Sequence, residues 1–462
     1  MPGGQLILKS NETVDQDMYI LGNPQVTFFK KVYRRHTNFY SEYRYNRFET
    51  NARIQFGNKG IVASIQNYGD LVGEMYLEVV IAGEANQKGV YTVNHFGNSL
   101  LKKVIVKIGG VTVDTHYAQW YQIWKELYDD KTTKEYIEAA SDATNGGKAT
   151  TLNYTNDTNR TKHALPDRME GDCPLVFGGE SAYGDYVANT TYRKKLKIPL
   201  RFFFNNNKGL ALPLCAMKTD KVELIFDFET QAELIGDSTN ITSMTLESCE
   251  LYVENYFLSK DEKTRFTNST HQYLVEQLQL QKDTLPSNDS VLSTELPNKN
   301  IELNSFHHPV KYLAWVVTNP GTPGNNSGQG PNYFTSMVPH SEHGNDGCYN
   351  TSTGSFSISF NGDSTYFDTI PMDHYTRTLP KRFCTRDMPE LDRIGIYSFA
   401  LDPMSLDPTG SVNFSRINQV DIDIKVSNNT ITTVANKTIY IFAVNYNVFQ
   451  VASNKGFMKY KF

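Results

Sequence analysis

The stretch from 397 to 426 reads YSFALDPMSLDPTGSVNFSRINQVDIDIKV and gives the clearest indication of the fold. At its end Val420, Ile422, Ile424 and Val426 are apolar, while the residues between them are polar or charged. A strand with one buried face and one solvated face needs this period of two. Before it, Asp, Pro and Gly residues gather as they do in turns. The stretch therefore predicts a turn-rich loop that leads into a half-buried strand.

Strand-like runs of the same kind recur along the whole chain. The alternation is repeated by Val222, Leu224, Phe226 and Phe228. Further apolar runs are separated by Gly, Asn, Asp and Pro turns, and they lie at 71–82, 101–113, 196–204, 249–258, 310–317, 395–401 and 438–449. This content predicts an all-β protein.

Two segments favour helices instead. In 116–130 the spacing places Trp120, Ile123, Trp124 and Leu127 on one stripe, as in an amphipathic helix. A weaker helical pattern covers 270–279. We expect such helices to be short insertions between strands.

The order of the strands and loops favours two consecutive β-sandwiches. Many short strands without a repeat of 20 to 50 residues fit sandwiches better than a propeller or a solenoid. The polar segments 141–161 and 318–330 are composed as long exposed loops. A third polar segment, 231–245, separates two strong strand patterns. We therefore expect a linker at 231–245, between a first domain that ends at 230 and a second domain at 246–462.

Composition and charge exclude several classes of partner. The 462 residues include 45 Lys and Arg against 50 Asp and Glu, a net charge of -5, so the basic excess needed for nonspecific phosphate binding is missing. The densest basic run consists of Lys30, Lys31, Arg34 and Arg35 interleaved with aromatic residues. That run resembles a nucleic-acid surface but equally suits a strand that contacts protein. We expect protein contacts there and no direct nucleic-acid ligand.

The cysteines predict reduced thiols. They are odd in number, scattered, and without the spacing of a disulfide framework or a metal knuckle: Cys173, Cys215, Cys249, Cys348 and Cys384. The chain lacks both an apolar stretch of membrane-spanning length and the pattern of a signal peptide, so we expect it to be made in the cytosol. Glycosylation is accordingly not expected, although the sequons at Asn153, Asn156 and Asn159 are the most exposed in character.

Motifs for catalysis and cofactor binding are missing from the sequence. It contains no GxSxG elbow, P-loop, GxGxxG or HExxH. His340 and His343, with Asp346 or Cys348, have partial zinc spacing, but no second ligand pair accompanies them. The carboxylates are dispersed, so no acid/base pair stands out. We expect no catalytic residues, no metal and no cofactor.

Four blocks of sequence are distinctive in residue type and spacing. They are GNPQVTFFKKVYRRHTNF at 22–39, PLRFFFNNNKGLALPL at 199–214, the part of the opening stretch at 397–422, and FAVNYNVFQVASNKG at 442–456. Together they resemble the double jelly-roll major capsid proteins of the nucleocytoplasmic large DNA viruses. In that family the second block is a hairpin, in which a Phe-rich strand turns at Asn and Gly and returns through an Ala-Leu-Pro strand. The third block resembles the family's signature, in which a strand that starts with Tyr is followed by a Pro-Gly-Ser turn and then by an Asn-Phe-Ser-Arg strand.

The resemblance implies two consecutive eight-stranded jelly rolls with short helical insertions and long loops. It also implies a homotrimer that forms a pseudo-hexagonal capsomer and tiles an icosahedral shell, assembled in the host cytoplasm or virus factory. It further implies an N-terminal arm at 1–25 and a first jelly roll at 26–230. Neighbouring capsomers, penton and minor capsid proteins would be partners, with an internal viral membrane near the N-terminal arm. Structural or interface residues are expected within the family motifs, at Asn23, Pro24, Phe28, Phe29, Arg34, Arg35, Phe202, Phe203, Phe204, Pro213, Pro403, Pro408, Asn413, Phe414, Arg416, Asn445 and Tyr446.

Two other classes of protein share this architecture. A carbohydrate-binding or carbohydrate-active β-sandwich enzyme would require a convergent Asp/Glu pair in a cleft, and a cupin-type metal enzyme would require a clustered set of His and Glu ligands. The sequence identifies neither set. A structural capsid protein is therefore the leading hypothesis.

Overall fold

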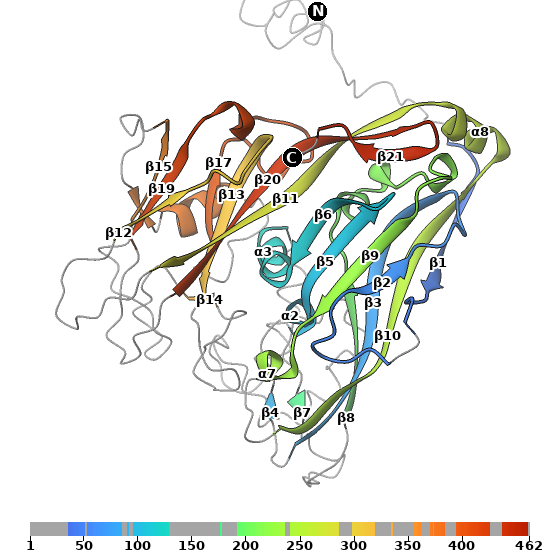
Figure 1. Ribbon diagram of the computed structural model, residues 1–462, viewed down its shortest axis with the longest axis horizontal. Coiled ribbons are helices and arrows are strands. Elements are labelled where there is room, and N and C mark those ends of the chain that lie inside the picture. Colours follow the sequence, from blue (N-terminus) through green and yellow to red (C-terminus); the bar gives the residue numbers. More distant parts are fainter. Residues whose placement is uncertain are drawn as a thin grey trace, which may run out of the picture. The chain divides into compact units, whose positions relative to one another are not determined.

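The computed structural model describes fourteen stretches of the chain, namely residues 36–50, 53–85, 90–91, 96–128, 176–177, 192–235, 241–285, 298–318, 334–335, 355–361, 370–372, 374–383, 394–425 and 437–460. The chain divides into two compact units, Met1–Asn38 and Phe39–Phe462. All strands and helices named below belong to the second unit (Figure 1).

The first sandwich consists of two four-stranded antiparallel sheets. One sheet has the order β1 (Phe39–Asn46), β10 (Ile241–Leu258), β3 (Leu71–Ala85) and β8 (Tyr192–Pro199). The other has the order β2 (Ile61–Ser64), β9 (Val222–Phe228), β5 (Leu101–Ile108) and β6 (Val111–Tyr117). A separate two-stranded sheet pairs β4 (Val90–Tyr91) with β7 (Val176–Phe177).

The second sandwich repeats this arrangement. Its larger sheet has β11 (His271–Leu285), β20 (Lys437–Ala452) and β13 (Pro309–Thr318) side by side, and β13 also pairs with β17 (Gly395–Ser398). Three short strands complete this sheet, namely β14 (Phe334–Thr335), β18 (Val412–Asn413) and β21 (Lys455–Met458). The facing sheet has the order β12 (Asn298–Glu302), β19 (Val420–Lys425), β15 (Ser355–Phe360) and β16 (Ile370–Pro371).

The two sandwiches have equivalent strand orders. The order β1-β10-β3-β8 corresponds to β11-β20-β13-β17, and β2-β9-β5-β6 corresponds to β12-β19-β15-β16. The predicted fold, two consecutive eight-stranded jelly rolls, is thereby confirmed, with β14, β18 and β21 as additions to the second.

The apolar residues of the alternating sequence patterns are buried, as expected. In β19, Val420, Ile422 and Ile424 are no more than 3% exposed and pack in the core of the second sandwich. In β9 all four alternating residues, Val222 to Phe228, lie in the core of the first. Burial of such side chains contributes about 1.5–3 kcal/mol each before the entropy cost of folding.

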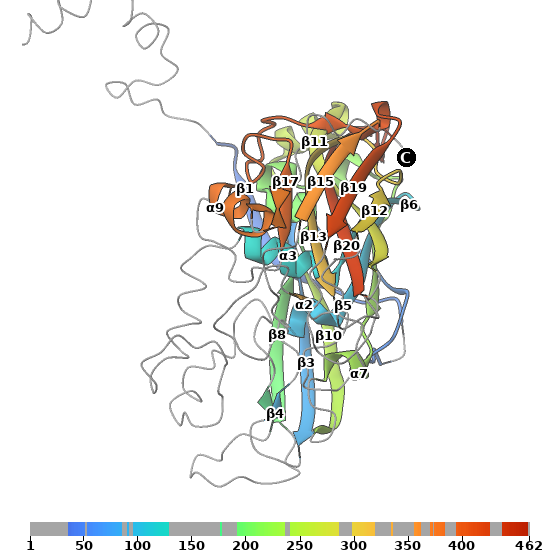
Figure 2. The ribbon, with the colours of Figure 1, turned by 90° about the vertical axis from the view of Figure 1, so that its left-hand side faces the viewer.

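Among the described residues the helices are short, and the longest of them is the one that the apolar stripe predicts. That helix, α3 (Ala118–Tyr128), buries Trp120, Ile123 and Leu127. The others are α2 (Phe96–Leu100), α6 (Phe203–Asn206), α7 (Gln231–Leu234), α8 (Lys260–Asn268) and α9 (Leu379–Phe383), the last preceded by a π-helix at His374–Thr378. Figure 2 shows α9 beside β17 at the edge of the second sandwich.

The weak helix expected at 270–279 is wrong, because this segment belongs to β11. All fifteen residues of β11 pair in register with β20, from His271 opposite Val451 to Leu285 opposite Lys437. This continuous ladder with a strand far along the chain outweighs a marginal helical pattern.

The hairpin expected at 199–214 is replaced by compact turns. After β8 the chain forms α6 and two 3-10 helices, Lys208–Leu210 and Leu214–Ala216, and only Leu212 makes a bridge, to Val72. The Asn205 side chain donates to the carbonyl of Gly73 at 2.9 Å and accepts from Phe202 N at 3.2 Å. Asparagine side chains of this kind compete with strand pairing and favour turns.

The Asn-Phe-Ser-Arg strand expected after the Gly turn is also mostly a turn. Strand β18 ends at Asn413, and Phe414–Arg416 form a 3-10 helix. The Asn413 side chain accepts from Ser415 N at 3.0 Å, which caps this helix instead of extending the strand.

Strand pairing shows where the chain passes from one sandwich to the other. The segment 231–245, expected as a linker, contains α7 and the first residues of β10. Strand β10 pairs with β3 and β1 as far as Leu258, so residues 246–258 belong to the first sandwich. The passage therefore lies between β10 and β11, where α8 is located.

Candidate functional site: the junction of the sandwiches and the loop after β17

Several of the residues singled out in the sequence lie outside the described residues. These are Asn23, Pro24, Phe28, Phe29, Arg34, Arg35 and the three sequon residues Asn153, Asn156 and Asn159. The partial zinc motif with His340 and His343 also lies there. The remaining candidates occur at three places in the structure, which are the core beneath α6, the loop after β17, and β20.

The three consecutive phenylalanines are internal anchors. Phe202, Phe203 and Phe204 are at most 6% exposed. Phe202 stacks on His116 with ring centroids 4.2 Å apart, and Phe203 lies 5.7 Å from Phe449 of β20. Pro213, also buried, precedes the second 3-10 helix. These rings fill the first sandwich and reach the second, so they stabilise the subunit from within.

Helix α3 lies between the two sandwiches (Figure 1). Its apolar side chains belong to a cluster of buried residues from both sandwiches. Its residues Trp120, Ile123 and Leu127 pack on the outer face of the sheet that contains β13 and β20. There they meet Tyr312 and Phe442, which are fully buried. One sandwich thus covers the sheet of the other with a helix.

Hydrogen bonds join the sandwiches on either side of this cluster. Leu278 N donates to Asp114 Oδ1 at 3.2 Å, and Gln277 donates to the carbonyl of Val113. Gly456 N donates to Asp220 Oδ2 at 2.9 Å. These bonds satisfy polar groups of both sandwiches at their interface, and the two jelly rolls lie within one compact unit of the chain.

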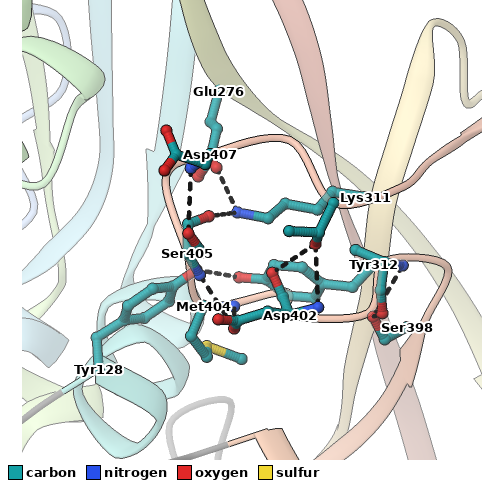
Figure 3. A network of polar contacts seen from close by, with 11 residues as sticks. Tyr128, Glu276, Lys311, Tyr312, Ser398, Asp402, Met404, Ser405 and Asp407 are labelled. Carbon is teal, nitrogen blue, oxygen red and sulfur yellow. Dashed lines mark hydrogen bonds and ion pairs between the residues drawn. The ribbon is translucent and has the colours of Figure 1, made fainter. Parts of the chain in front are cut away.

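The residues 399–411 form the β17–β18 loop, which is held by its own polar groups (Figure 3). Asp402 Oδ1 accepts from Met404 N at 3.1 Å and from Ser405 N at 3.2 Å. Thr409 Oγ1 donates to the Asp402 carbonyl and accepts from Asp402 N, both at 3.0 Å. Ser398 accepts from Ala400 N at 3.1 Å at the start of the loop.

Lys311 supports this loop from below. Its side chain is 1% exposed, and its ammonium group contacts Glu276 Oε1 at 2.5 Å and the Ser405 carbonyl at 2.5 Å. The ammonium also lies 5.7 Å from the centre of the Tyr446 ring, where a cation–π contact adds to the pair. Burial raises the pKa of Tyr446 to about 12, with the Glu276 carboxylate acting in the same direction.

The loop presents two apolar side chains to solvent. Leu401 is 80% exposed and Leu406 is 54% exposed. Pro403 is buried below them, while Pro408 and Arg416 are exposed. The loop is therefore a fixed shape whose outward side is partly apolar, as expected of a surface that meets another protein.

Asn445 belongs to a buried set of amides rather than to the surface. It is fully buried and accepts from Gln279 Nε2 at 2.8 Å. The Gln279 side chain also accepts from His307 N at 2.9 Å and donates to the His307 carbonyl at 2.7 Å. These bonds connect β11, β20 and the residues before β13.

The described residues hold no cluster of three or more His, Cys, Asp or Glu side chains that would bind a metal ion. Cys215 and Cys249 are free thiols whose pKa values are raised by burial, and the other three cysteines lie outside the described residues. Among the described helices, none is both long and apolar enough to span a membrane.

The sequence alone did not identify Lys311, Glu276 or the α3 cluster as a functional unit. Lys311 reads as an ordinary polar residue in a strand, and its two partners lie 35 and 94 residues away. No local spacing carries such a signal. The stripe on α3 predicted burial but not the sheet that covers it.

Two family models match consecutive parts of the chain. Residues 27–259 match the model described as major capsid protein N-terminus. Residues 262–456 match the model described as large eukaryotic DNA virus major capsid protein. The two matches meet near α8, where the chain passes between the sandwiches.

Relatives and solved structures agree with these matches. The chain is 31% identical to the major capsid protein of Pyramimonas orientalis virus, over 96% of each chain. It is also 31% identical to that of Paramecium bursaria Chlorella virus 1, over 96% of this chain and 97% of the relative. The crystal structure of PBCV-1 VP54, as fitted into a cryo-EM reconstruction of the virophage Sputnik, matches with a TM-score of 0.70 at 26% identity, and the match covers 94% of this chain and 100% of that one.

Proposed function

Because the chain belongs to the family of large eukaryotic DNA virus major capsid proteins, we propose that three copies associate into one capsomer. The observation that carries the proposal is the repeated strand order of the two jelly rolls within one chain. Three chains then supply six nearly equivalent sandwiches, which form a ring with a pseudo-hexagonal outline. Such rings tile the flat facets of an icosahedral shell.

The protein is a structural component of the virion capsid and assembles with further copies of itself. Its relatives are named major capsid proteins, and a matching structure is a virus capsid. The work it performs is mechanical, since it fixes the angle between two sandwiches and offers surfaces to neighbours. The rigid junction around α3 supplies the first of these functions.

The finer assignments of the proposal concern position within the shell. The N-terminal arm, 1–25, faces the capsomer base, minor capsid proteins and an internal membrane, and the segments 141–161 and 318–330 face outward. Penton proteins and neighbouring capsomers contact the rim, and assembly takes place in the host cytoplasm or virus factory. The family-motif residues Pro403, Pro408, Asn413, Phe414 and Arg416 act by shaping the β17–β18 loop for these contacts. The net charge of -5 supports the absence of direct nucleic-acid contact.

The boundary between the two jelly rolls belongs to the same proposal. We place it within α8, after β10 and before β11, since β10 completes the first eight-stranded sandwich. An N-terminal fragment that ends at 259 should fold better than one that ends at 238, because the shorter fragment lacks β10, an inner strand of the sheet β1-β10-β3-β8.

Negative-stain electron microscopy of the purified protein tests the capsomer directly. Class averages with threefold symmetry and a nearly hexagonal outline are expected. Particles with the size and two-lobed shape of a single chain, at all concentrations, would contradict the proposal.

A further inference from the structure

The outer face of the sheet β1-β10-β3-β8 carries an aromatic row across three strands. Tyr45, Tyr252 and Tyr76 are direct neighbours in register, and Tyr76 and Tyr252 stack with centroids 5.1 Å apart. Tyr43 lies beside them, 5.5 Å from Tyr76. Tyr43 is 44% and Tyr45 is 41% exposed, an unusual exposure for neighbouring aromatic rings on a sheet.

Among the described residues this face has more carboxylates than cations, since only Lys195 and Lys197 of β8 lie beside them, with Lys197 Nζ 5.7 Å from the centre of the Tyr76 ring. Glu74 accepts from the Tyr43 hydroxyl at 2.7 Å, Glu250 from the Tyr252 hydroxyl at 3.0 Å, and Glu254 from the Tyr256 hydroxyl at 2.8 Å. Within the described residues none of these three carboxylates forms an ion pair, whereas Glu78 next to them is paired with Lys195 at 2.6 Å. We name this surface the tyrosine–glutamate face, comprising Tyr43, Tyr45, Tyr76, Tyr252, Glu74, Glu250 and Glu254.

The equivalent face of the second sandwich has a partner within the chain. Its strands β13 and β20, which correspond to β3 and β10, are covered by α3 of the first sandwich. Helix α3 follows β6 and precedes β8. In the second sandwich the π-helix and α9 occupy the equivalent place, after β16 and before β17.

The α9 segment is complementary in charge to the tyrosine–glutamate face. Residues 374–383, HYTRTLPKRF, include no acidic residue. Lys381 and Arg382 are exposed, while Phe383 anchors the helix in the apolar cluster at the junction. The positive side of α9 thus points away from its own sandwich.

We propose that α9 of one copy docks, through Lys381 and Arg382, on the tyrosine–glutamate face of the next copy. The inference rests on the proposed function, and it names the contact that closes the capsomer. The contact between chains would repeat the contact that α3 makes within a chain. In both, a helix that follows the equivalent strand in the sequence packs on the outer face of the sheet of another sandwich. The contact is heterologous, so copies join head to tail and close into a ring.

A two-fold contact through the tyrosine–glutamate face is disfavoured by charge. It would place Glu74, Glu250 and Glu254 against their own counterparts, and like charges facing each other across an interface cost several kcal/mol. Tyrosines are common at protein interfaces, where rings bury apolar area and hydroxyls keep hydrogen bonds. A cationic helix from a second copy meets both requirements.

Charge reversal tests the contact by analytical ultracentrifugation. For wild-type protein we expect trimers, and for Lys381→Glu with Arg382→Glu a dissociation constant raised on the order of 100-fold, with monomers at micromolar concentration. Adding Glu74→Lys and Glu250→Lys to that variant should restore trimers. The matched control, Lys208→Glu with Lys218→Glu, reverses two exposed lysines elsewhere and should remain trimeric.

The outcomes separate the inference from the proposed function. Wild-type monomers would overturn the capsomer itself. If the wild type is trimeric and the variant with Lys381→Glu and Arg382→Glu is equally trimeric, the docking of α9 is overturned and the capsomer stands. A four-site variant that stays monomeric although its circular dichroism is native would overturn the docking in the same way.

Carbodiimide crosslinking of the wild-type protein gives a readout that does not depend on the folding of variants. We expect a peptide that contains Lys381 to be joined to a peptide that contains Glu74 or Glu250, in the trimer band only. A trimer band whose Lys381 crosslinks lead solely to other surfaces, or to another capsid protein, would contradict the inference.

Discussion

Replacing Lys311 by methionine should loosen the β17–β18 loop without unfolding the sandwiches. Methionine keeps most of the volume of the buried stem and removes only the ammonium group. Glu276 Oε1 and the Ser405 carbonyl, each 2.5 Å from that group, then lose their donor. The loop would have to open or recruit water at this point.

The free-energy cost of Lys311→Met follows from the burial of the ion pair between Lys311 and Glu276. Removing one partner of a buried ion pair costs about 3–5 kcal/mol. The Glu276 side chain is 26% exposed, so water partly solvates the carboxylate that remains, and the lower end of the range applies. About 3 kcal/mol corresponds to an increase on the order of 100-fold in the population of the open loop.

Hydrogen exchange measured by mass spectrometry on a peptide that covers the β17–β18 loop reports this population. The matched control is Lys299→Met, which removes an ion pair to Asp283 at 3.4 Å between side chains about one third exposed. That pair should contribute less than about 1 kcal/mol. Exchange in the loop that changes no more in Lys311→Met than in Lys299→Met would refute the reasoning.

Three further changes test other parts of the structure. Gly395→Ala would place a methyl carbon 2.1 Å from Trp315 Cε2, so we expect a loss of about 1–3 kcal/mol and a lower melting temperature, and an unchanged melting temperature would contradict this packing. The pKa of His308 is lowered by burial and then by His307, so its contribution to stability is present above about pH 6.5 and is lost as pH falls through the folded-state pKa. His308→Asn, which tolerates the φ of 67° at this position, should therefore lose less stability between pH 7 and pH 5 in thermal melts than wild type, and parallel losses would count against the assignment. Burial raises the pKa of the Cys249 thiol, so alkylation at pH 8 should be much slower in folded than in denatured protein, and equal rates would show that the site is open.

The parts of the fold that local patterns determine could be predicted from the sequence. In β19 the alternation of Val420, Ile422 and Ile424 reflects one buried face, and the structure buries those three residues. The stripe on α3 likewise reflects one apolar side. Each pattern repeats with the period of its own element, so no distant contact is needed to interpret it.

Features set by distant contacts could not be predicted in this way. The segment 270–279 became a strand because β20, more than 150 residues later, pairs with all of β11. The turns at 199–214 depend on Asn205, whose side chain reaches the carbonyl of Gly73. Lys311 gains its role from Glu276 and from the loop carbonyl of Ser405, which only the fold brings together.

The mass of the particle in solution tests the central claim most directly. Native mass spectrometry of the purified chain should give a species of about 157 kDa, three times the chain mass of 52.4 kDa. A dominant species at 52.4 kDa over the whole micromolar range, from protein with native β-sheet content, would contradict the capsomer account.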